Sequence, residues 1–329
     1  MKVAVFSSKL YDETYFNQFN QSGEIELVYF KESLNPNSVR LASDFDAICV
    51  FVNDIVDAEI LKMLKEMGIG LIALRCAGFN NVDIAKANEL DIKIVRVPAY
   101  SPEAVAEHAV ALILTLNRKT HKAYNRVREG NFSLEKLTGF NLADKTVGVI
   151  GTGKIGAAFC KIMQGFSCKV LAYDKYPNKA LADTGVEYVE VDDLMQQSDI
   201  ISLHCPLNEE TKHIINKHTL KEMKNGVMLI NTSRGGLINT KHVVKALKHK
   251  KVGFLGIDVY EQEENLFFED LSEDIIQDEL IMRLISFPNV VITSHQAFLT
   301  KEALEQIATT TLNNILDHKH GLELKNAVN

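Results

Sequence analysis

A glycine-rich segment in the middle of the chain constrains the fold more than any other feature. Residues 147–156 read Val-Gly-Val-Ile-Gly-Thr-Gly-Lys-Ile-Gly, so an apolar run passes directly into glycines spaced as G-x-G-x-x-G. In a strand-turn-helix unit, Gly151 permits the sharp turn, Gly153 lets backbone amides approach a pyrophosphate, and Gly156 lets the helix pack closely on the sheet. We therefore predict a Rossmann unit whose dinucleotide site begins near residue 150.

A carboxylate follows this loop at the spacing that dinucleotide sites require. Asp174 ends the next apolar run, about 20 residues further on, where it would accept hydrogen bonds from an adenosine ribose and repel a 2′-phosphate. This favours NAD over NADP, although Lys175 would soften the repulsion. The alternative is a glycine-rich turn that packs against the sheet and binds nothing.

The length and composition point to two globular domains and a small-molecule partner. A chain of 329 residues with 46% hydrophobic residues exceeds one ordinary core. The net charge of −7 is spread out, without a Lys/Arg block, which argues against nucleic-acid and membrane binding. Met1 leads into an apolar run without a signal segment, so we expect a cytoplasmic protein. The five cysteines show no CxxC spacing, so we expect structural thiols and no metal site.

Short apolar runs alternate with helix-like stretches, which predicts parallel βαβ units. The expected strands of the first domain are Val3–Phe6, Ile25–Phe30, Ala47–Val52, Leu71–Leu74 and Ile94–Val97. Six further strands are expected in the second domain, at Thr146–Ile150, Lys169–Tyr173, Ile200–Leu203, Val227–Asn231, Phe254–Val259 and Val290–Thr293. Six such strands suit a Rossmann sheet.

The order of these elements makes the first domain discontinuous. A helix-like stretch at Lys301–Leu316 has no place in the Rossmann sheet, so it would return to the first domain. We predict two doubly wound parallel-sheet α/β domains, with a Rossmann NAD-binding domain at residues 101–298 inserted in a flavodoxin-like substrate domain at residues 1–100 and 299–329. The expected helix Glu103–Leu116 would link the domains, and its broad apolar surface fits either a buried intramolecular helix or a dimer interface.

Three polar side chains follow apolar runs of the second domain, at strand ends where open parallel sheets bind ligands. Arg234 could bind a carboxylate with two hydrogen bonds, and His295 could accept a hydroxyl proton while hydride leaves for NAD. Glu263 would orient His295 and favour the charged imidazolium. This set suits the oxidation of a 2-hydroxy acid or the reverse reduction. Taken singly, each residue also has a purely structural interpretation, as a strand-end cap, a surface acid or a packed histidine.

Several segments resemble the D-2-hydroxyacid dehydrogenase family, most closely its fermentative D-lactate dehydrogenases. They include Gly-Val-Met-Leu-Ile-Asn-Thr-Ser-Arg-Gly-Gly at 226–236, Gly-Ile-Asp-Val-Tyr-Glu-Gln-Glu at 256–263 and Thr-Ser-His-Gln-Ala-Phe-Leu-Thr at 293–300. Residues 75–81 and 97–108 extend the resemblance to the first domain, so it covers nearly the whole chain. The resemblance implies a homodimer that reduces pyruvate to D-lactate with NADH. It assigns Arg234 as the substrate anchor, Glu263 as the partner of the histidine and His295 as the acid/base.

The resemblance also implies further binding residues. On the cofactor side these are Lys154, Ile155, Asp174, Cys205, Pro206, Thr232, Ser233 and Asp258, in addition to the loop glycines. On the substrate side they are Phe51, Ala77, Gly78, Tyr100 and Phe298, in addition to Arg234. Ordinary core packing is the alternative for Phe51 and Phe298. We interpret Cys205 and His108 as packed side chains rather than catalytic groups.

Two other functions remain open on the sequence. A dehydrogenase for larger, branched 2-keto acids would share all these residues. Within the family that this chain resembles, formate dehydrogenases lack a glutamate partner for the histidine, so Glu263 argues against that activity, and phosphoglycerate enzymes usually need further cationic residues. A non-catalytic NAD-sensing interaction protein is the alternative from another class, because transcriptional corepressors resemble this family and can retain its catalytic residues.

Overall fold

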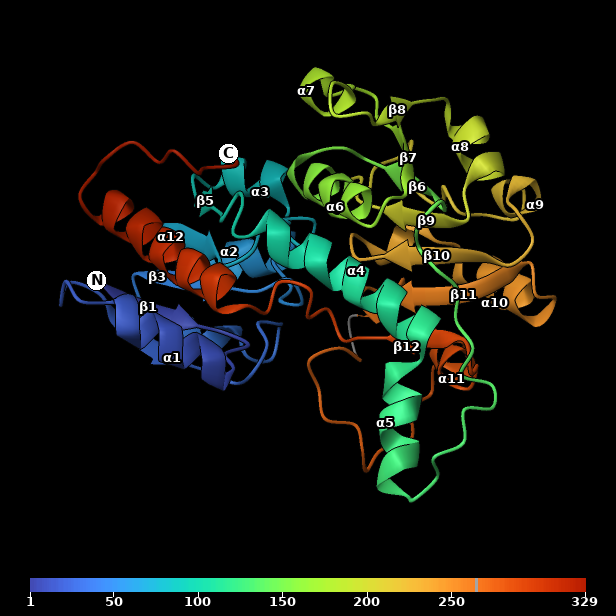
Figure 1. Ribbon diagram of the computed structural model, residues 1–329. Coiled ribbons are helices and arrows are strands. Elements are labelled where there is room, and N and C mark those ends of the chain that lie inside the picture. Colours follow the sequence, from blue (N-terminus) through green and yellow to red (C-terminus); the bar gives the residue numbers. More distant parts are fainter. Residues whose placement is uncertain (264–265) are drawn as a thin grey trace. The chain divides into compact units, whose positions relative to one another are not determined.

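The computed structural model describes residues 1–263 and 266–329, which form two compact units (Figure 1). The first unit comprises Met1–Ser101 and Phe298–Asn329, and the second comprises Pro102–Ala297. The expected boundaries, at 100/101 and 298/299, differ from these by one residue each. No helix in the described part of the chain is long and apolar enough to cross a bilayer.

The first unit is built on a five-stranded parallel sheet in the flavodoxin-like order β2-β1-β3-β4-β5. Its strands are β1 (Lys2–Val5), β2 (Glu26–Tyr29), β3 (Ala47–Val50), β4 (Leu71–Leu74) and β5 (Lys93–Val95). The helices are α1 (Leu10–Phe19), α2 (Ala58–Glu66), α3 (Ile84–Glu89), α12 (Lys301–Lys319) and the 3₁₀ turn η1 (Val39–Ala42). Helix α12 completes this unit, because Ala308, Leu312 and Ile315 pack with the buried strand residues.

The second unit contains a seven-stranded parallel sheet in the order β12-β11-β10-β9-β6-β7-β8. Its strands are β6 (Thr146–Ile150), β7 (Lys169–Tyr173), β8 (Glu187–Tyr188), β9 (Ile200–Leu203), β10 (Val227–Asn231), β11 (Val252–Ile257) and β12 (Val290–Ile292). The sequence missed β8, since two residues show no periodicity. The strand expected at Phe254–Val259 is shifted, because Asp258 already follows the strand. The predicted fold class, a Rossmann and a flavodoxin-like sheet in one chain, is confirmed.

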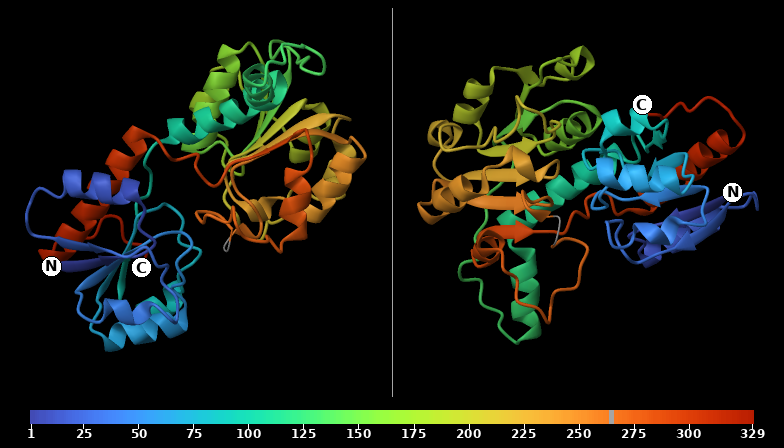
Figure 2. Two further views of the ribbon diagram at one scale, coloured as in Figure 1. Left: turned by 90° about the horizontal axis from the view of Figure 1, so that it is seen from below. Right: turned by 180° about the vertical axis from the view of Figure 1, so that it is seen from behind.

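Helices cover both faces of each sheet, as the two further views show (Figure 2). Those of the second unit are α4 (Pro102–Arg118), α5 (Thr120–Arg128), α6 (Lys154–Gly165), α7 (Lys179–Ala182), α8 (Val191–Gln197), α9 (Thr219–Glu222), α10 (Thr240–Lys248), α11 (Glu279–Ile285) and the 3₁₀ turn η2 (Gly235–Leu237). The apolar side of α4 packs within this unit, where Ala109 and Ile113 join the cluster that contains Val149 and Ile230. The broad apolar surface of the expected linking helix is therefore intramolecular.

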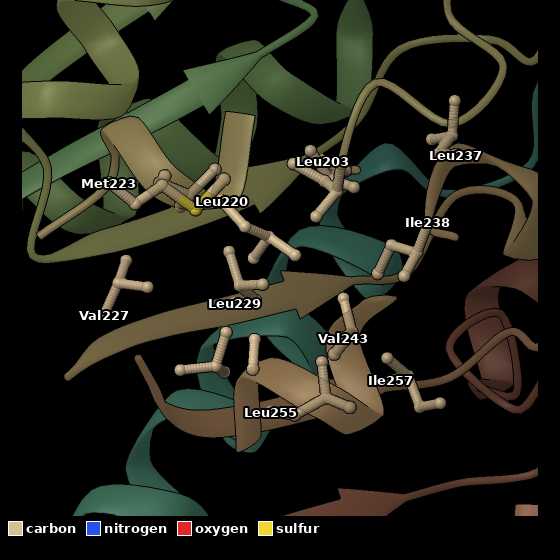
Figure 3. Packing of buried hydrophobic residues seen from close by; sticks show 14 of the residues in the cluster. Leu203, Leu220, Met223, Val227, Leu229, Leu237, Ile238, Val243, Leu255 and Ile257 are labelled. Carbon is tan, nitrogen blue, oxygen red and sulfur yellow. The ribbon is translucent and has the colours of Figure 1, made fainter. Parts of the chain in front are cut away.

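Alternation along β10 explains why both faces are filled. Met228 and Ile230 belong to the cluster beneath α4 and α6, whereas Leu229 belongs to the opposite cluster. Figure 3 shows Leu229 in that opposite cluster, together with Leu220 of α9 and Val243 of α10. Burying each such side chain contributes about 1.5–3 kcal/mol, so the strands are fixed from both sides. Their carboxyl ends then present the loops that carry the candidate site.

Candidate active site

The glycine loop has the geometry that its spacing predicts. Gly151 lies at φ +93°, in the region that favours glycine, and its amide donates to the Tyr173 carbonyl at 2.8 Å. A Cβ on Gly156 would meet the Gly151 carbonyl oxygen at 1.9 Å, so only glycine lets α6 come this close to the turn. A Cβ on Gly153 would meet nothing within 4 Å. The loop is therefore tight at Gly151 and Gly156 and open at Gly153.

The first turn of α6 faces this open position without a side-chain cap. Gly153 is the N-cap residue and provides no side-chain hydrogen bond, so the helix terminus can receive an anion at the amides of Lys154 and Ile155. Asp174 follows β7, and its carboxylate accepts hydrogen bonds from the amide and the hydroxyl of Thr152 and from the Tyr176 amide at 2.8 Å. These bonds tie the carboxylate to the glycine loop.

His295 and Glu263 form a direct pair. His295 Nδ1 lies 3.0 Å from Glu263 Oε1, and the two side chains are only 17% and 23% exposed. The other carboxylate oxygen of Glu263 accepts from the Tyr260 amide at 2.8 Å, which fixes the carboxylate on the loop after β11. Nδ1 is thus committed to Glu263, and Nε2 is the ring nitrogen left for a reacting group.

The loop that carries His295 is held by a buried carboxylate. Asp258 is fully buried, and its oxygens accept from the Gln296 amide at 2.9 Å, the Ala297 amide at 2.8 Å and the Thr293 hydroxyl at 2.5 Å. The His295 amide donates to the Asp258 carbonyl at 2.8 Å, and His295 itself lies at φ +47°. Asp258 therefore holds the histidine in a backbone conformation that non-glycine residues rarely adopt.

Arg234 lies on the loop after β10, next to the loop that carries Glu263. A Cβ on the adjacent Gly235 would meet the Tyr260 carbonyl carbon at 2.0 Å, so the two loops are in contact. The Arg234 carbonyl accepts from Asn231 Nδ2 at 2.8 Å, and its guanidinium donates to the Ser233 carbonyl at 2.7 Å. The remaining guanidinium donors of this half-buried side chain suit a carboxylate.

The aromatic residues predicted for the substrate wall lie together in the first unit. The Phe298 ring centroid is 6.0 Å from that of Phe51 and 6.2 Å from that of Tyr100. Tyr11, which belongs to no sequence motif, adds a fourth ring, with its centroid 6.4 Å from that of Phe298. The carbonyl of Ala77 accepts from Arg96 Nη1 at 2.8 Å, and that of Gly78 accepts from Cys76 Sγ at 3.3 Å. The first unit thus contains an aromatic cluster and a segment, at Ala77 and Gly78, whose carbonyls are hydrogen-bonded.

Comparison with known proteins assigns the chain to a family. Residues 110–297 match the sequence model of the protein family described as "D-isomer specific 2-hydroxyacid dehydrogenase, NAD binding domain". The chain belongs to this dehydrogenase family. It is 53% identical over 321 residues to a D-lactate dehydrogenase of Escherichia coli (strain K12), with 98% of each chain covered. The apo-structure of D-lactate dehydrogenase from Escherichia coli superposes with a TM-score of 0.92 at 49% identity, covering 100% of each chain.

A relative with bound ligands is also similar. The structure of D-lactate dehydrogenase from Aquifex aeolicus, complexed with NAD and lactic acid, has a TM-score of 0.87 at 34% identity and covers 99% of this chain and 98% of that one. The chain is therefore an NAD-dependent oxidoreductase of the 2-hydroxyacid dehydrogenase family, and the predicted cofactor, NAD, is confirmed. The roles of individual site residues stay predictions.

The second unit of this dehydrogenase fits NAD at several points. The open Gly153, the uncapped start of α6 and the anchored Asp174 suit the pyrophosphate and the ribose. Thr232 is buried after β10, and its hydroxyl has no partner in the described part of the chain, which leaves a donor and acceptor for a ligand. Ser233 donates to the Cys205 carbonyl at 2.7 Å and so joins the β9 and β10 loops. Pro206, next to Cys205, is exposed at the end of the β9 loop.

Cys205 and His108 of this dehydrogenase are of residue types that often act in catalysis, but the structure gives both a packing role. Burial raises the pKa of the Cys205 thiol to about 11, so it is no thiolate nucleophile at neutral pH. His108 of α4 lies 2.9 Å from the Thr293 hydroxyl and 3.4 Å from Asp258, so it buttresses the carboxylate that holds the His295 loop. Two residues beside this loop were not recognised from the sequence. They are Thr293 and Phe268, and the Phe268 ring centroid lies 5.9 Å from that of His295. Neither residue type carries a motif of its own.

Proposed function

We propose that this protein is an NAD-dependent D-lactate dehydrogenase that reversibly reduces pyruvate. The observation that carries the proposal is the His295–Glu263 pair, a paired imidazole on the sheet that also carries the glycine loop. An acid/base group is needed only where a proton moves with the hydride, as in the interconversion of a keto acid and a hydroxy acid. Similarity to the D-lactate dehydrogenase of Escherichia coli supports pyruvate as the substrate.

In the proposed reaction, the glycine loop and Asp174 would hold NADH, which would supply the hydride for the carbonyl carbon of pyruvate. Arg234 binds the substrate carboxylate and polarises the carbonyl. His295, as imidazolium, donates its Nε2 proton to the carbonyl oxygen, which becomes the hydroxyl of D-lactate. Glu263 stabilises the positive charge on the ring before this transfer and keeps the ring oriented afterwards. In lactate oxidation, the same nitrogen accepts the hydroxyl proton.

We further propose that residues of the first unit select the substrate. The amides of Ala77 and Gly78, together with Tyr100, would bind the carboxylate. Phe51 and Phe298, which belong to one aromatic cluster, would surround the side chain of the keto acid. Bulky rings around this position favour the methyl group of pyruvate over a branched chain. Dehydrogenation of larger, branched 2-hydroxy acids is the alternative.

The proposal is tested by NADH oxidation with purified protein and pyruvate, 2-ketoisocaproate or hydroxypyruvate as substrate, with NADPH as the cofactor control. We expect the highest kcat/KM with pyruvate and NADH, and D-lactate as the product on chiral analysis. Preference for 2-ketoisocaproate would overturn the pyruvate assignment while keeping the chemistry. Binding of NADH without turnover of any keto acid would instead support the NAD-sensing alternative.

Two variants test the residue roles. We expect His295→Ala to lower kcat by about 10²–10⁴, the usual contribution of general acid/base catalysis, while NADH binding persists. Arg234→Ala should raise KM for pyruvate and also lower kcat, because a carboxylate anchor acts in binding and in the transition state. A near-wild-type kcat for His295→Ala would remove that residue from the mechanism.

A further inference from the structure

A basic pocket lies on the second unit, outside the site described above. Its volume is about 330 Å³, and six of its lining residues carry basic nitrogen atoms: Lys217, Lys221, His242, Lys245, His249 and Lys251. The other lining residues are apolar, and no carboxylate lines this pocket in the described part of the chain. A pocket of this size is in the range that holds small molecules.

The pocket concentrates positive charge in an acidic protein. Residues 217–251 contain nine Lys or Arg residues and one acidic residue, Glu222, whereas the whole chain has a net charge of −7. Within the described residues, Lys217, Lys221, Lys245 and Lys251 make no ion pair. The electrostatic cost of gathering these charges is thus not offset by neighbouring carboxylates.

Local contacts hold this arrangement in place rather than relieving it. Lys251 Nζ donates to the Lys221 carbonyl at 3.0 Å and to the Met223 carbonyl, which joins the two sides of the pocket. The Nδ1 atom of His242 is buried without a hydrogen-bond partner in the described part of the chain. An anion in the pocket would relieve the repulsion.

The pocket lies at the opposite edge of the sheet from the cofactor loops. Met223 and Lys251 precede β10 and β11, whereas Arg234 and Asp258 follow those strands. A strand rises about 3.3 Å per residue, so strands of five or six residues separate the two edges by roughly 15–20 Å. An anion bound here would therefore not occupy the pyrophosphate position of NAD.

We propose that this pocket binds a small polyanion that carries three or more negative charges, supplied by phosphate or carboxylate groups. Four ammonium groups and two imidazoles around one cavity favour a multivalent ligand over a single monovalent anion, because each added charge gains several attractive interactions at short range. The concave shape and limited volume favour a small molecule over a nucleic-acid strand. This site is independent of the dehydrogenase reaction.

The test is isothermal titration calorimetry, in which the protein is titrated with tripolyphosphate and, separately, with citrate. The protein is first saturated with NADH so that the cofactor phosphate position is filled. We expect saturable binding of one anion per chain, weakened when salt is raised to about 0.15 M, because screening reduces attraction between exposed charges. Binding of tripolyphosphate alone would assign a phosphate ligand, binding of citrate alone a carboxylate ligand, and binding of both recognition by charge.

Paired variants locate the binding. Lys221→Gln/Lys245→Gln should weaken anion binding at least about tenfold. Lys241→Gln/Lys248→Gln, which removes two exposed charges of α10 that do not line the pocket, should weaken it less than about threefold. Without anion, the pocket variant should melt at or above the wild-type temperature because repulsion is removed. Absence of saturable binding to either anion, or equal loss in both variants, would overturn the proposal. Neither result depends on turnover.

Discussion

At the scale of single residues, Asp258 links the fold to the chemistry. Burial raises the pKa of this carboxyl, but hydrogen bonds from His108, Thr293 and the amides of Ala297 and Gln296 outweigh that effect and hold the pKa below its usual value. The carboxylate is therefore ionised at neutral pH and accepts from the amides that follow His295. One buried charge thus fixes the position of the proposed acid/base.

We expect Asp258→Asn to lower the free energy of unfolding at pH 7 by about 2–4 kcal/mol, because hydrogen bonds to a charged group are lost and an amide donor faces amide donors. Since the folded-state pKa is depressed, the stabilising effect is fully present above the unfolded value of about 3.9 and is lost as the pH falls from there through the lower folded-state pKa. Urea unfolding at pH 7 and near pH 3 measures this, and the gap between wild type and variant should narrow in acid. Thr293→Val, which removes only one donor, should cost less, and a variant gap that stays constant with pH would contradict the role of the charge.

The thiol of Cys205 gives a second prediction at this scale. Because burial raises its pKa to about 11, this cysteine should react with 5,5′-dithiobis(2-nitrobenzoate) far more slowly at pH 8 in the native protein than in urea. Thiol titration of the wild type and of Cys205→Ala identifies its share of the signal. The variant should also retain turnover within a few fold. Rapid reaction of Cys205 in the native state, or loss of activity comparable to that of His295→Ala, would contradict the assignment as a packed thiol.

At the scale of secondary-structure elements, the β6-α6 turn shows that the three glycines of the G-x-G-x-x-G loop have different structural roles. Gly151 supplies the positive φ of the turn, and Gly156 supplies the close contact between α6 and the Gly151 carbonyl. Gly153 meets neither requirement. Its φ is not positive, and an added Cβ would meet nothing within 4 Å. Its requirement for glycine would come from the ligand alone. The turn therefore separates a folding requirement from a binding requirement.

We expect Gly156→Ala to lower the melting temperature and to weaken NADH binding. The added Cβ would lie 1.9 Å from the Gly151 carbonyl oxygen, so α6 would have to move away from the turn. Gly153→Ala should change the melting temperature far less than Gly156→Ala yet weaken NADH binding, since its methyl group meets no protein atom and would crowd the cofactor. Gly165→Ala at the other end of α6, where a Cβ meets nothing within 4 Å, is the matched control and should be neutral or stabilising by up to about 1 kcal/mol. Thermal melts and NADH fluorescence titration measure both quantities. Wild-type NADH affinity in Gly153→Ala would argue against pyrophosphate binding at this loop.

At the scale of the whole molecule, the segment that contains α5 lacks a core of its own. None of the α5 residues is buried, and Tyr124, Val127, Phe132 and Leu134 are 62%, 51%, 75% and 81% exposed. The end of this segment is tied back to the start of α5, because Lys119 Nζ donates to the carbonyls of Lys136 and Thr138 at 2.9 and 2.8 Å. Grouped exposed apolar side chains are typical of a protein interface. We propose that this surface joins two copies of the chain in a homodimer.

Light scattering after size exclusion tests this proposal. We expect the wild type to have twice the chain mass of 36.8 kDa, and Phe132→Glu/Leu134→Glu to shift toward the monomer with an unchanged far-ultraviolet spectrum. Ile275→Glu is the control, because Ile275 is 85% exposed elsewhere in the second unit and should leave the dimer intact. A monomeric wild type, or a dimer that survives both glutamates in α5's segment, would contradict this interface.

Sequence patterns predicted the elements that repeat or carry motifs. The glycine spacing predicted a Rossmann unit, and apolar runs at Leu71–Leu74, Thr146–Ile150 and Val227–Asn231 coincide with β4, β6 and β10. Asp258 and the two-residue β8 show the limit, since the end of a strand and a very short strand leave little periodicity. The basic pocket was also missed, because its lysines are spread over residues 217–251 and gather only when α9, α10 and the start of β11 pack together.

The sequence by itself determined the fold class, the place of the dinucleotide loop and the residue types that could perform the chemistry, because these depend on local spacing and periodicity. Only the tertiary structure decided which side chains meet: Glu263 with His295, and His108 and Thr293 with Asp258. It also decided that the apolar side of α4 is covered within the second unit, while the apolar side chains around α5 remain exposed. Contacts of this kind join residues far apart in the chain, and burial depends on what packs against a surface, so neither can be read from local pattern.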